Sequence, residues 1–269
     1  MHCVTVIVPV LNAERSLSIA VRSAVHIVDV GEVIIVDDAS NDASLSIARG
    51  LADEFDKVRV ITAGGGMTRG PGWARNLAIR EAGCNVVAFL DADDAYLPLR
   101  FKEHVSLLRS RDDIDGVYGN VRACFEDGAA KKKWFSRYST QRYGVRAPVR
   151  PDALFETLLN GCSGHFHTNA ITVRKSLLDK VGGFDEDLWL GQDSAMWLRM
   201  ALMGRVIGPV PDYEIALWRI HRGNRSFQSI EEKRQRVQSC LLSVLAWGEQ
   251  TDVDQEALSK LRQRISKVA

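Results

Sequence analysis

The sequence has little net charge and lacks long hydrophobic runs. Its 269 residues carry 35 Lys and Arg against 34 Asp and Glu, which leaves a formal net charge of +1. A polybasic nucleic-acid binder needs an excess of cations to neutralise phosphates, so we expect no nucleic-acid partner. No run approaches the roughly 18 apolar residues that a membrane-spanning helix requires. These two absences favour a soluble enzyme or binding protein.

Cysteine is also scarce. The five cysteines are Cys3, Cys84, Cys124, Cys162 and Cys240, and none of them forms a CxxC pair. Their odd number and wide spacing fit neither a disulfide framework nor a zinc knuckle, so we predict reduced, mostly buried thiols in a cytoplasmic protein. The apolar residues 3–9 have no basic region before them and no small-residue cleavage site after them. They predict a first strand rather than a signal peptide.

Several common catalytic motifs are missing. The glycine run at residues 64–66 continues to Gly70, but Arg69 occupies the last glycine position of a GxGxxG motif. Pro71 follows Gly70 where a P-loop requires Lys. The sequence has no GxSxG nucleophile elbow and no HExxH zinc helix. Dinucleotide-dependent oxidoreduction and P-loop hydrolysis therefore lose support.

Short β-branched runs alternate with helical patterns in the first half of the chain. Strands are predicted at residues 4–8, 33–36, 58–61 and 86–90, and helices at 13–28, 43–55, 71–82 and from Pro98 onward. This order predicts a parallel sheet with right-handed crossovers and helices on both faces.

The pattern changes after about residue 120. Residues 128–151 hold seven basic side chains and no acidic one, interleaved with aromatic residues. We predict a long, mobile excursion here rather than core. A strand is predicted at 170–173, and helical segments around Leu177 and Met196. Two further helices are predicted at about 229–247 and 254–266.

Acidic side chains follow two of the predicted strands. Asp37 and Asp38 come directly after the second, and Asp91, Asp93 and Asp94 after the fourth. In open parallel sheets, ligands bind beyond the carboxyl ends of the strands. Residues two apart in an extended segment point to the same side, so Asp91 and Asp93 can face one Mg²⁺ or Mn²⁺ ion.

An ordered series of motifs resembles family 2 glycosyltransferases, which have the GT-A fold. The matching pieces are 4–12, 33–40, 72–78, 89–94, 181–186, Gln192-Asp193 with 197–199, and 218–221. The series covers about residues 4–225. It implies an α/β GT-A (Rossmann-like) fold, a mostly parallel sheet flanked by helices. By this resemblance, residues 1–225 form the catalytic domain, with a nucleotide-binding half at about 1–120 and an acceptor half at about 121–225. Residues 226–269 form a C-terminal helical extension.

The resemblance implies how a nucleotide is held. Pro9, Asn12 and Glu14 line the nucleotide pocket, and Asp38 accepts a hydrogen bond from the pyrimidine ring. Arg75 lies near the diphosphate.

The resemblance also implies a metal site. Asp91 faces the ribose or the metal, and Asp93 binds the Mn²⁺ or Mg²⁺ that bridges the diphosphate. His221 matches a position that contributes to metal or diphosphate binding; the alternative is a hydrogen-bonded surface histidine. The metal offsets the charge that develops on the leaving diphosphate.

Direct displacement at the anomeric carbon needs a base for the acceptor hydroxyl, and the resemblance assigns this role to Asp193. The alternative for Asp193 is a helix cap. The family has Glu-Asp at this point, whereas this chain has Gln192-Asp193. The neutral amide puts in doubt any pKa tuning or acceptor contact by the missing carboxylate.

The acceptor side is less defined. His165 and His167 resemble a metal-binding HxH, but an acceptor-side wall or hydrogen-bonded turns are the favoured interpretation. Arg219 is a candidate phosphate contact. The basic aromatic stretch at 131–143 is either a solvated loop or a contact for an anionic acceptor, such as a lipid diphosphate, or for a membrane surface.

These inferences predict a metal-dependent, inverting glycosyltransferase. It transfers a sugar from a uridine-linked nucleotide-diphosphate donor to a hydroxyl of a glycan, glycolipid or lipid-linked acceptor. Two alternatives stay open: an inactive nucleotide-sugar binding module, suggested by Gln192, and a sugar nucleotidylyltransferase, whose basic glycine-rich signature residues 11–15 lack. We expect a cytoplasmic protein. Peripheral association with the inner face of the membrane and a homo-oligomer both stay open.

Overall fold

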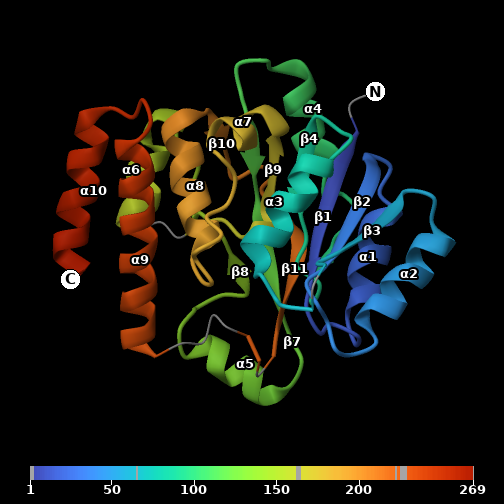
Figure 1. The fold of residues 1–269 in the computed structure, drawn as a ribbon. Coiled ribbons are helices and arrows are strands. Elements are labelled where there is room, and N and C mark those ends of the chain that lie inside the picture. The colour runs from blue at the N-terminus through green and yellow to red at the C-terminus, as the bar shows by residue number, and fades with distance from the viewer. Residues whose placement is uncertain (1–2, 65, 162–164, 222, 225–228, 269) are drawn as a thin grey trace.

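A seven-stranded sheet forms the centre of the molecule (Figure 1), in a computed structural model that describes residues 3–64, 66–161, 165–221, 223–224 and 229–268. Its strand order is β10-β6-β9-β4-β1-β2-β3. The strands are β1 (Val4–Val10), β2 (Val30–Asp37), β3 (Val58–Thr62), β4 (Val86–Phe89), β6 (Gly116–Tyr118), β9 (Ile171–Arg174) and β10 (Val206–Ile207). β1 pairs in parallel with β2 and β4, and β2 pairs in parallel with β3, whereas β9 runs antiparallel to β4 and β6. The predicted mostly parallel sheet is confirmed.

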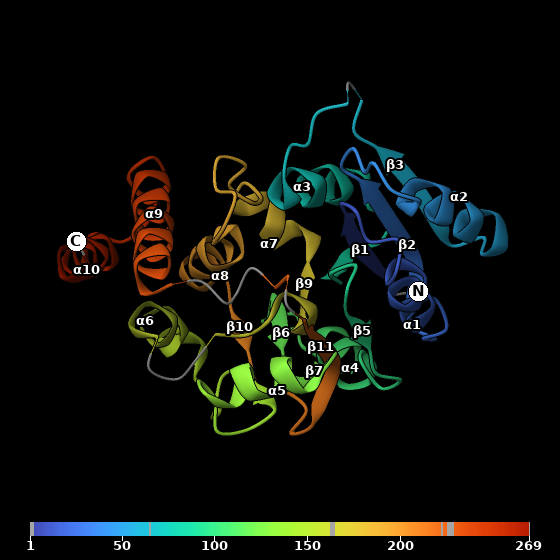
Figure 2. The ribbon, with the colours of Figure 1, turned by 90° about the horizontal axis from the view of Figure 1, so that it is seen from below.

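Helices cover both faces of this sheet, because its central strands are apolar on both sides. In β1, Val6 and Val8 face one core and Ile7 faces the other. The first face is covered by α1 (Leu17–Val25), α2 (Ser44–Glu54) and α4 (Lys102–Ser110). The second is covered by α3 (Pro71–Glu81), α6 (Leu154–Asn160), α7 (Lys175–Lys180) and α8 (Gln192–Met203). Figure 2 shows α1 and α3 on opposite sides of β1.

The two C-terminal helices, α9 (Ile230–Glu249) and α10 (Gln255–Val268), lie side by side at one edge of the molecule (Figure 1). α9 packs on α8, and its Leu241 and Val244 are buried in the same core as Trp197 of α8. The predicted helical extension is therefore present and shares the core of the sheet domain. The predicted boundary at 225/226 lies outside the described residues. No described helix combines the length and the apolar character that a membrane crossing needs.

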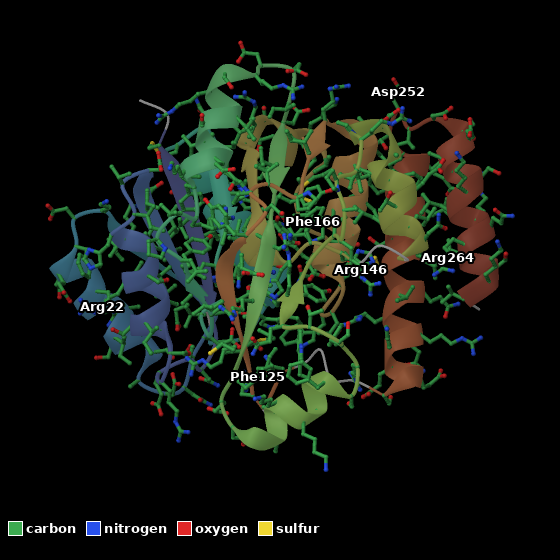
Figure 3. All side chains as sticks on the ribbon, turned by 180° about the vertical axis from the view of Figure 1, so that it is seen from behind. Arg22, Phe125, Arg146, Phe166, Asp252 and Arg264 are labelled. Carbon is green, nitrogen blue, oxygen red and sulfur yellow. A yellow bond between two sulfur atoms is a disulfide. The ribbon has the colours of Figure 1, made fainter. Side chains whose placement is uncertain are left out.

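The basic stretch 128–151 is not an excursion outside the core, and that prediction is wrong. It contributes α5 (Gly128–Phe135) and β8 (Arg142–Tyr143) to a second, four-stranded sheet of order β5-β11-β7-β8. The other strands are β5 (Ala95–Tyr96), β7 (Asn120–Phe125) and β11 (Glu214–Ile220). Trp134 of α5 is fully buried against Tyr138 and Trp218, and Phe125 lies beside α5 at the end of β7 (Figure 3). The basic side chains stay at the surface while the aromatic ones between them form a small core.

The prediction of reduced thiols is wrong for two cysteines. Cys3 and Cys84 form a disulfide with a Cα–Cα distance of 5.6 Å. Each lies just before a strand, and those two strands, β1 and β4, are neighbours in the sheet. Spacing along the chain does not reveal this pairing, because the partners are 81 residues apart. Cys124 is free and exposed, Cys240 is free and buried, and Cys162 lies outside the described residues.

We expect reduction of this disulfide to lower the free energy of unfolding by about 2–4 kcal/mol, because the closed loop restricts the unfolded chain. Urea unfolding with and without dithiothreitol measures the effect. The double variant Cys3→Ser/Cys84→Ser should match the reduced wild type and show no further response to dithiothreitol. Cys124→Ser, which removes an exposed free thiol, is the matched control. Equal unfolding midpoints with and without reductant would contradict the expectation.

Candidate functional site

A cleft of about 790 Å³ opens beyond the carboxyl ends of β1, β2 and β4, a size that is typical of ligand sites. It is lined by Pro9, Asn12, Glu14, Asp38, Arg75, Asp91, Asp93, His167, Gln192, Asp193, Arg219 and His221. Of the candidate residues from the sequence, His165 alone does not line it. The structure thus brings together side chains that lie as far apart in the chain as Pro9 and His221.

Asn12 and Glu14 connect the loop after β1 to the loop after β2 through hydrogen bonds. Asn12 Oδ1 accepts a hydrogen bond from the backbone N–H of Asn41 at 2.8 Å, and Glu14 Oε2 accepts one from Ala43 at 3.1 Å. Asn12 has a φ of 54°, a left-handed conformation that Asn tolerates better than most residues. These contacts form one wall of the cleft, which Pro9 of β1 also lines.

Asp38 is buried and holds the start of α3 in place. Its two carboxylate oxygens accept hydrogen bonds from the backbone N–H groups of Arg69, at 2.8 Å, and Gly70, at 2.7 Å. Gly70 has a φ of 96°, which favours glycine, and directly precedes Pro71, the first residue of α3. Asp38 therefore orders the two residues directly before α3. The remaining lone pairs of the carboxylate leave room for a ligand N–H.

Arg75 connects the acidic edge of the sheet to α8. Its Nη2 donates to Asp91 Oδ1 at 2.7 Å, and its Nη1 donates to Gln192 Oε1 at 3.2 Å. Arg75 and Gln192 are both buried. The amide oxygen of Gln192 is an adequate acceptor for this bond, so the substitution of the family's Glu leaves the connection in place without adding another charge.

Asp93, in the turn between β4 and β5, contacts His221, which directly follows β11. His221 Nε2 lies 3.0 Å from Asp93 Oδ2, and this hydrogen bond raises the pKa of His221 above its usual value. His221 Nδ1 accepts from the N–H of Gly223 at 3.1 Å, so the ring proton sits on Nε2 and is donated to Asp93. The predicted pair is therefore in contact. Ligation of a metal through Nε2 would release this proton.

Asp94 lies behind these groups and is almost fully buried. Its Oδ1 accepts from the backbone N–H of Arg219 at 2.7 Å, and its Oδ2 accepts from Asn169 Nδ2 at 2.6 Å. Burial raises the pKa of Asp94 well above its usual range, and the neighbouring Asp93 and Asp91 raise it further. Burial and the two neighbouring carboxylates thus both disfavour the charged form of Asp94.

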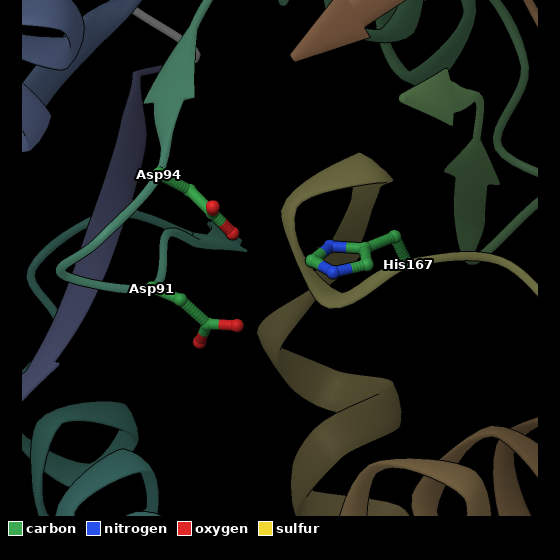
Figure 4. Close-up of side chains that lie close together, drawn as sticks. All are labelled: Asp91, Asp94 and His167. Atoms are coloured by element: carbon green, nitrogen blue, oxygen red, sulfur yellow. The ribbon is translucent and has the colours of Figure 1, made fainter. Parts of the chain in front are cut away.

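The donor set suits a hard divalent cation. Asp91, Asp94 and His167 each place one potential ligand atom within 4.8 Å of the others (Figure 4). Burial lowers the pKa of His167, which favours the neutral imidazole that a metal needs. Carboxylate oxygens and imidazole nitrogen are ligands for Mn²⁺, and a cation here would offset the crowded carboxylates. The side chains present therefore fit a Mn²⁺ or Mg²⁺ ion.

Asp193 lies in the first turn of α8. It directly follows Gln192, which accepts the hydrogen bond from Arg75. Its Oδ1 accepts from the N–H of Ser194 at 2.7 Å. Within the described part of the chain, its Oδ2 makes no hydrogen bond and Asp193 forms no ion pair. The local bond to Ser194 fits the capping alternative, but it occupies one oxygen and leaves the other available to accept a proton.

The two histidines of the HxH sequence separate in the structure. His167 lines the cleft and packs against Trp218, with ring centroids 4.7 Å apart. Among the described residues, His165 Nδ1 is buried without a hydrogen-bond partner, and burial lowers the pKa of its imidazole. The acceptor-side position predicted for both residues is untested.

Sequence reasoning missed several residues of the cleft. Asn169 and the proximity of Asp94 to His167 depend on how the 3-10 turn Thr168–Ala170 approaches β4, which no local pattern encodes. Trp189 and Arg236 also line the cleft. A Trp four residues before Asp193 was the available sequence signal for Trp189, whereas Arg236 carried no signal at all.

Comparison with known proteins identifies the class. The family model for glycosyl transferase family 2 matches residues 5–179, so the chain belongs to this family and the resemblance seen in the sequence is confirmed. Among curated relatives, the succinoglycan biosynthesis protein ExoU of Rhizobium meliloti is 27% identical over 212 residues. That match covers 75% of this chain and only 57% of the relative, so the chain spans little more than half of its length.

Two solved structures show the same fold. TarS of S. aureus in complex with UDP-GlcNAc matches with a TM-score of 0.72 and 18% identity, over 99% of this chain and 71% of TarS. The mannosyltransferase PcManGT from Pyrobaculum calidifontis, in complex with GDP-Man and Mn²⁺, matches with a TM-score of 0.66 and 20% identity. That match covers 98% of this chain and 69% of PcManGT. The predicted GT-A fold is confirmed.

Proposed function

We propose that this chain is the catalytic part of a metal-dependent, inverting glycosyltransferase that uses a uridine-linked nucleotide-diphosphate sugar. The observation that carries the proposal is that one cleft is lined both by a group of carboxylates after β4, Asp91, Asp93 and Asp94, and by Asp193 in the first turn of α8. The group after β4 suits a metal-bound diphosphate, and Asp193 is suited to act as a general base. Family membership and the fold support the same chemistry.

The donor-binding roles follow from the walls of the cleft. The nucleotide pocket is lined by Pro9, Asn12, Glu14 and Asp38. A carboxylate oxygen of Asp38 would accept a hydrogen bond from the pyrimidine ring of the nucleotide. Arg75 is held beside Asp91, where its guanidinium can meet diphosphate oxygens while Asp91 faces the ribose or the metal.

The metal would be held by Asp93, with His221 contributing to the metal or the diphosphate. When bound, it would supply positive charge to the leaving diphosphate. Asp91, Asp94 and His167 form a second group of potential ligands around the same edge. Arg219 anchors this edge, because its Nε donates to the carbonyl of Asp93 at 3.0 Å.

Asp193 is the proposed base. Its free Oδ2 would take the proton of the acceptor hydroxyl as that oxygen bonds to the anomeric carbon and the bond to the diphosphate breaks. One base and no covalent intermediate give inversion. The acceptor is a hydroxyl of a glycan, glycolipid or lipid-linked molecule, and Gln192 and the histidines face that side in this proposal.

We propose residues 1–225 as the catalytic domain, with a donor half at about 1–120 and an acceptor half at about 121–225, and 226–269 as its helical extension. A cytoplasmic location, peripheral membrane contact and a homo-oligomer stay predictions. Gln192 keeps the inactive binding module as the second candidate, and turnover decides between the two. The nucleotidylyltransferase alternative has no supporting contact in the cleft.

A thermal-shift panel of nucleotide-diphosphate sugars, with and without Mn²⁺, tests the proposal. A donor at 100 times its Kd should stabilise the fold by about 2.7 kcal/mol, because it binds only the native state. We expect the shift with uridine diphosphate sugars and Mn²⁺, and a smaller one without the metal. Absence of a shift with every member of the panel would refute a nucleotide-sugar enzyme and a binding module alike.

A further inference from the structure

The helical extension contributes a positively charged side chain to the cleft. Arg236 of α9 lines the cleft, although it lies outside residues 5–179 that match the family. Its stem packs on Gly191, where an added Cβ would lie 3.2 Å from Arg236 Cγ. Gly191 is the N-cap of α8, with a φ of 85°, and directly precedes Gln192 and Asp193. The half-buried Arg236 is therefore fixed beside the proposed base.

Arg236 and Asp193 share the same surroundings. The charge of Asp193 raises the pKa of Tyr143, His165 and Cys240, whereas the charge of Arg236 lowers it. Within the described part of the chain, the side chain of Arg236 forms no ion pair and donates no hydrogen bond. A half-buried guanidinium that keeps its donors open next to a base is suited to a ligand anion rather than to the fold.

A second cation stands one turn earlier on α9. Lys233 precedes Arg236 by three residues, so both occupy the same face of the helix. The charge of Lys233, like that of Arg236, lowers the pKa of His165. The acidic residue nearest to this face in sequence, Glu232, is engaged in the capping box with Ser229. Among the described residues, neither side chain donates a hydrogen bond, and two such adjacent cationic groups suit a phosphate better than a group with one negative charge.

We propose that Arg236, assisted by Lys233, binds a phosphate group of the acceptor next to the hydroxyl that Asp193 deprotonates. The acceptor substrate is then a phosphate-bearing molecule, and the extension selects it. This inference rests on the proposed function, because it assumes that Asp193 marks the acceptor side. The phosphate could belong to a lipid diphosphate or to a polyol phosphate chain, and the experiment separates these sources.

Binding is measured with UDP and excess Mn²⁺ already occupying the donor site. The probes are decyl diphosphate, a glycerol phosphate oligomer and, as the neutral control, decyl glucoside. The variants are Arg236→Gln, Arg236→Lys and Lys233→Gln. Arg234→Gln is the matched control, because Arg234 lies on the same helix but its Nε donates to the carbonyl of Val268.

We expect wild type to bind one phosphate probe more tightly than the neutral probe, and the preferred probe identifies the source. Arg236→Gln should weaken that binding about tenfold, the scale of one lost charge-assisted hydrogen bond. Arg236→Lys and Lys233→Gln should lose less, and Arg234→Gln should match wild type. Lys233→Gln also keeps the test decisive if Arg236→Gln does not fold.

Three results would overturn the inference: no phosphate preference in wild type, equal phosphate binding by wild type and the Arg236 and Lys233 variants, or weakened UDP binding in Arg236→Gln. The last would place Arg236 on the donor. Failure of wild type to bind UDP with Mn²⁺ is a different outcome, because it refutes the proposed function itself.

Discussion

We expect Asp193→Asn to lower the turnover of sugar transfer by about 10²–10⁴-fold, the usual contribution of a general base, and to leave donor affinity unchanged. Asparagine keeps the shape of the side chain, and its carbonyl oxygen can still accept the hydrogen bond from Ser194. It cannot accept a proton from the acceptor hydroxyl at neutral pH. Turnover and the Kd for the donor, measured on the same preparation, separate these two effects.

Asp252→Asn is the matched control for this measurement. It makes the same chemical change at an exposed position in the connection between α9 and α10, and Figure 3 shows Asp252 at the periphery of the molecule. Its turnover should equal that of wild type. If Asp193→Asn also kept full turnover, Asp193 would be a helix cap and another group would be the base. A parallel loss of donor binding would instead place Asp193 at the donor.

The first half of the fold could be predicted because its strands are buried on both faces. Residues 6–8 of β1 and 33–36 of β2 are continuously apolar, and the acidic residues that follow the second run, Asp37 and Asp38, coincide with the edge of the sheet. The second sheet could not be predicted in this way. β5 and β8 contain two residues each, too few for any periodicity, and β8 owes its place to the burial of Trp134 nearby.

The same distinction applies to the cleft. Motif order predicted which strand ends contribute, and the structure places Asp93 and His221 in contact, while their role as metal ligands stays a prediction. Partners from distant segments were invisible, as with the disulfide at Cys3 and with Arg236. The interpretation of Gln192 also needed the structure, because only the bond from Arg75 shows that an amide can serve there.

Asp93→Asn should abolish the Mn²⁺ dependence of donor binding and lower turnover at least about 100-fold, because the charge that stabilises the leaving diphosphate is lost with the metal. Asparagine can still accept the hydrogen bond from His221 Nε2, so the local fold is retained. The measurement is a donor titration at increasing Mn²⁺ concentration. Wild-type affinity should rise with Mn²⁺, whereas the affinity of the variant should stay at the metal-free level.

His167→Ala is the informative comparison, because it removes a potential ligand from the second group while leaving Asp93 and His221 intact. If Asp93 holds the metal, His167→Ala keeps most of the Mn²⁺ response. If Asp91, Asp94 and His167 hold it instead, the pattern reverses: Asp93→Asn responds to Mn²⁺ and His167→Ala does not. The buried Asp94 is a poor choice for this test, since its bonds to Arg219 and Asn169 tie its loss to folding rather than to the metal.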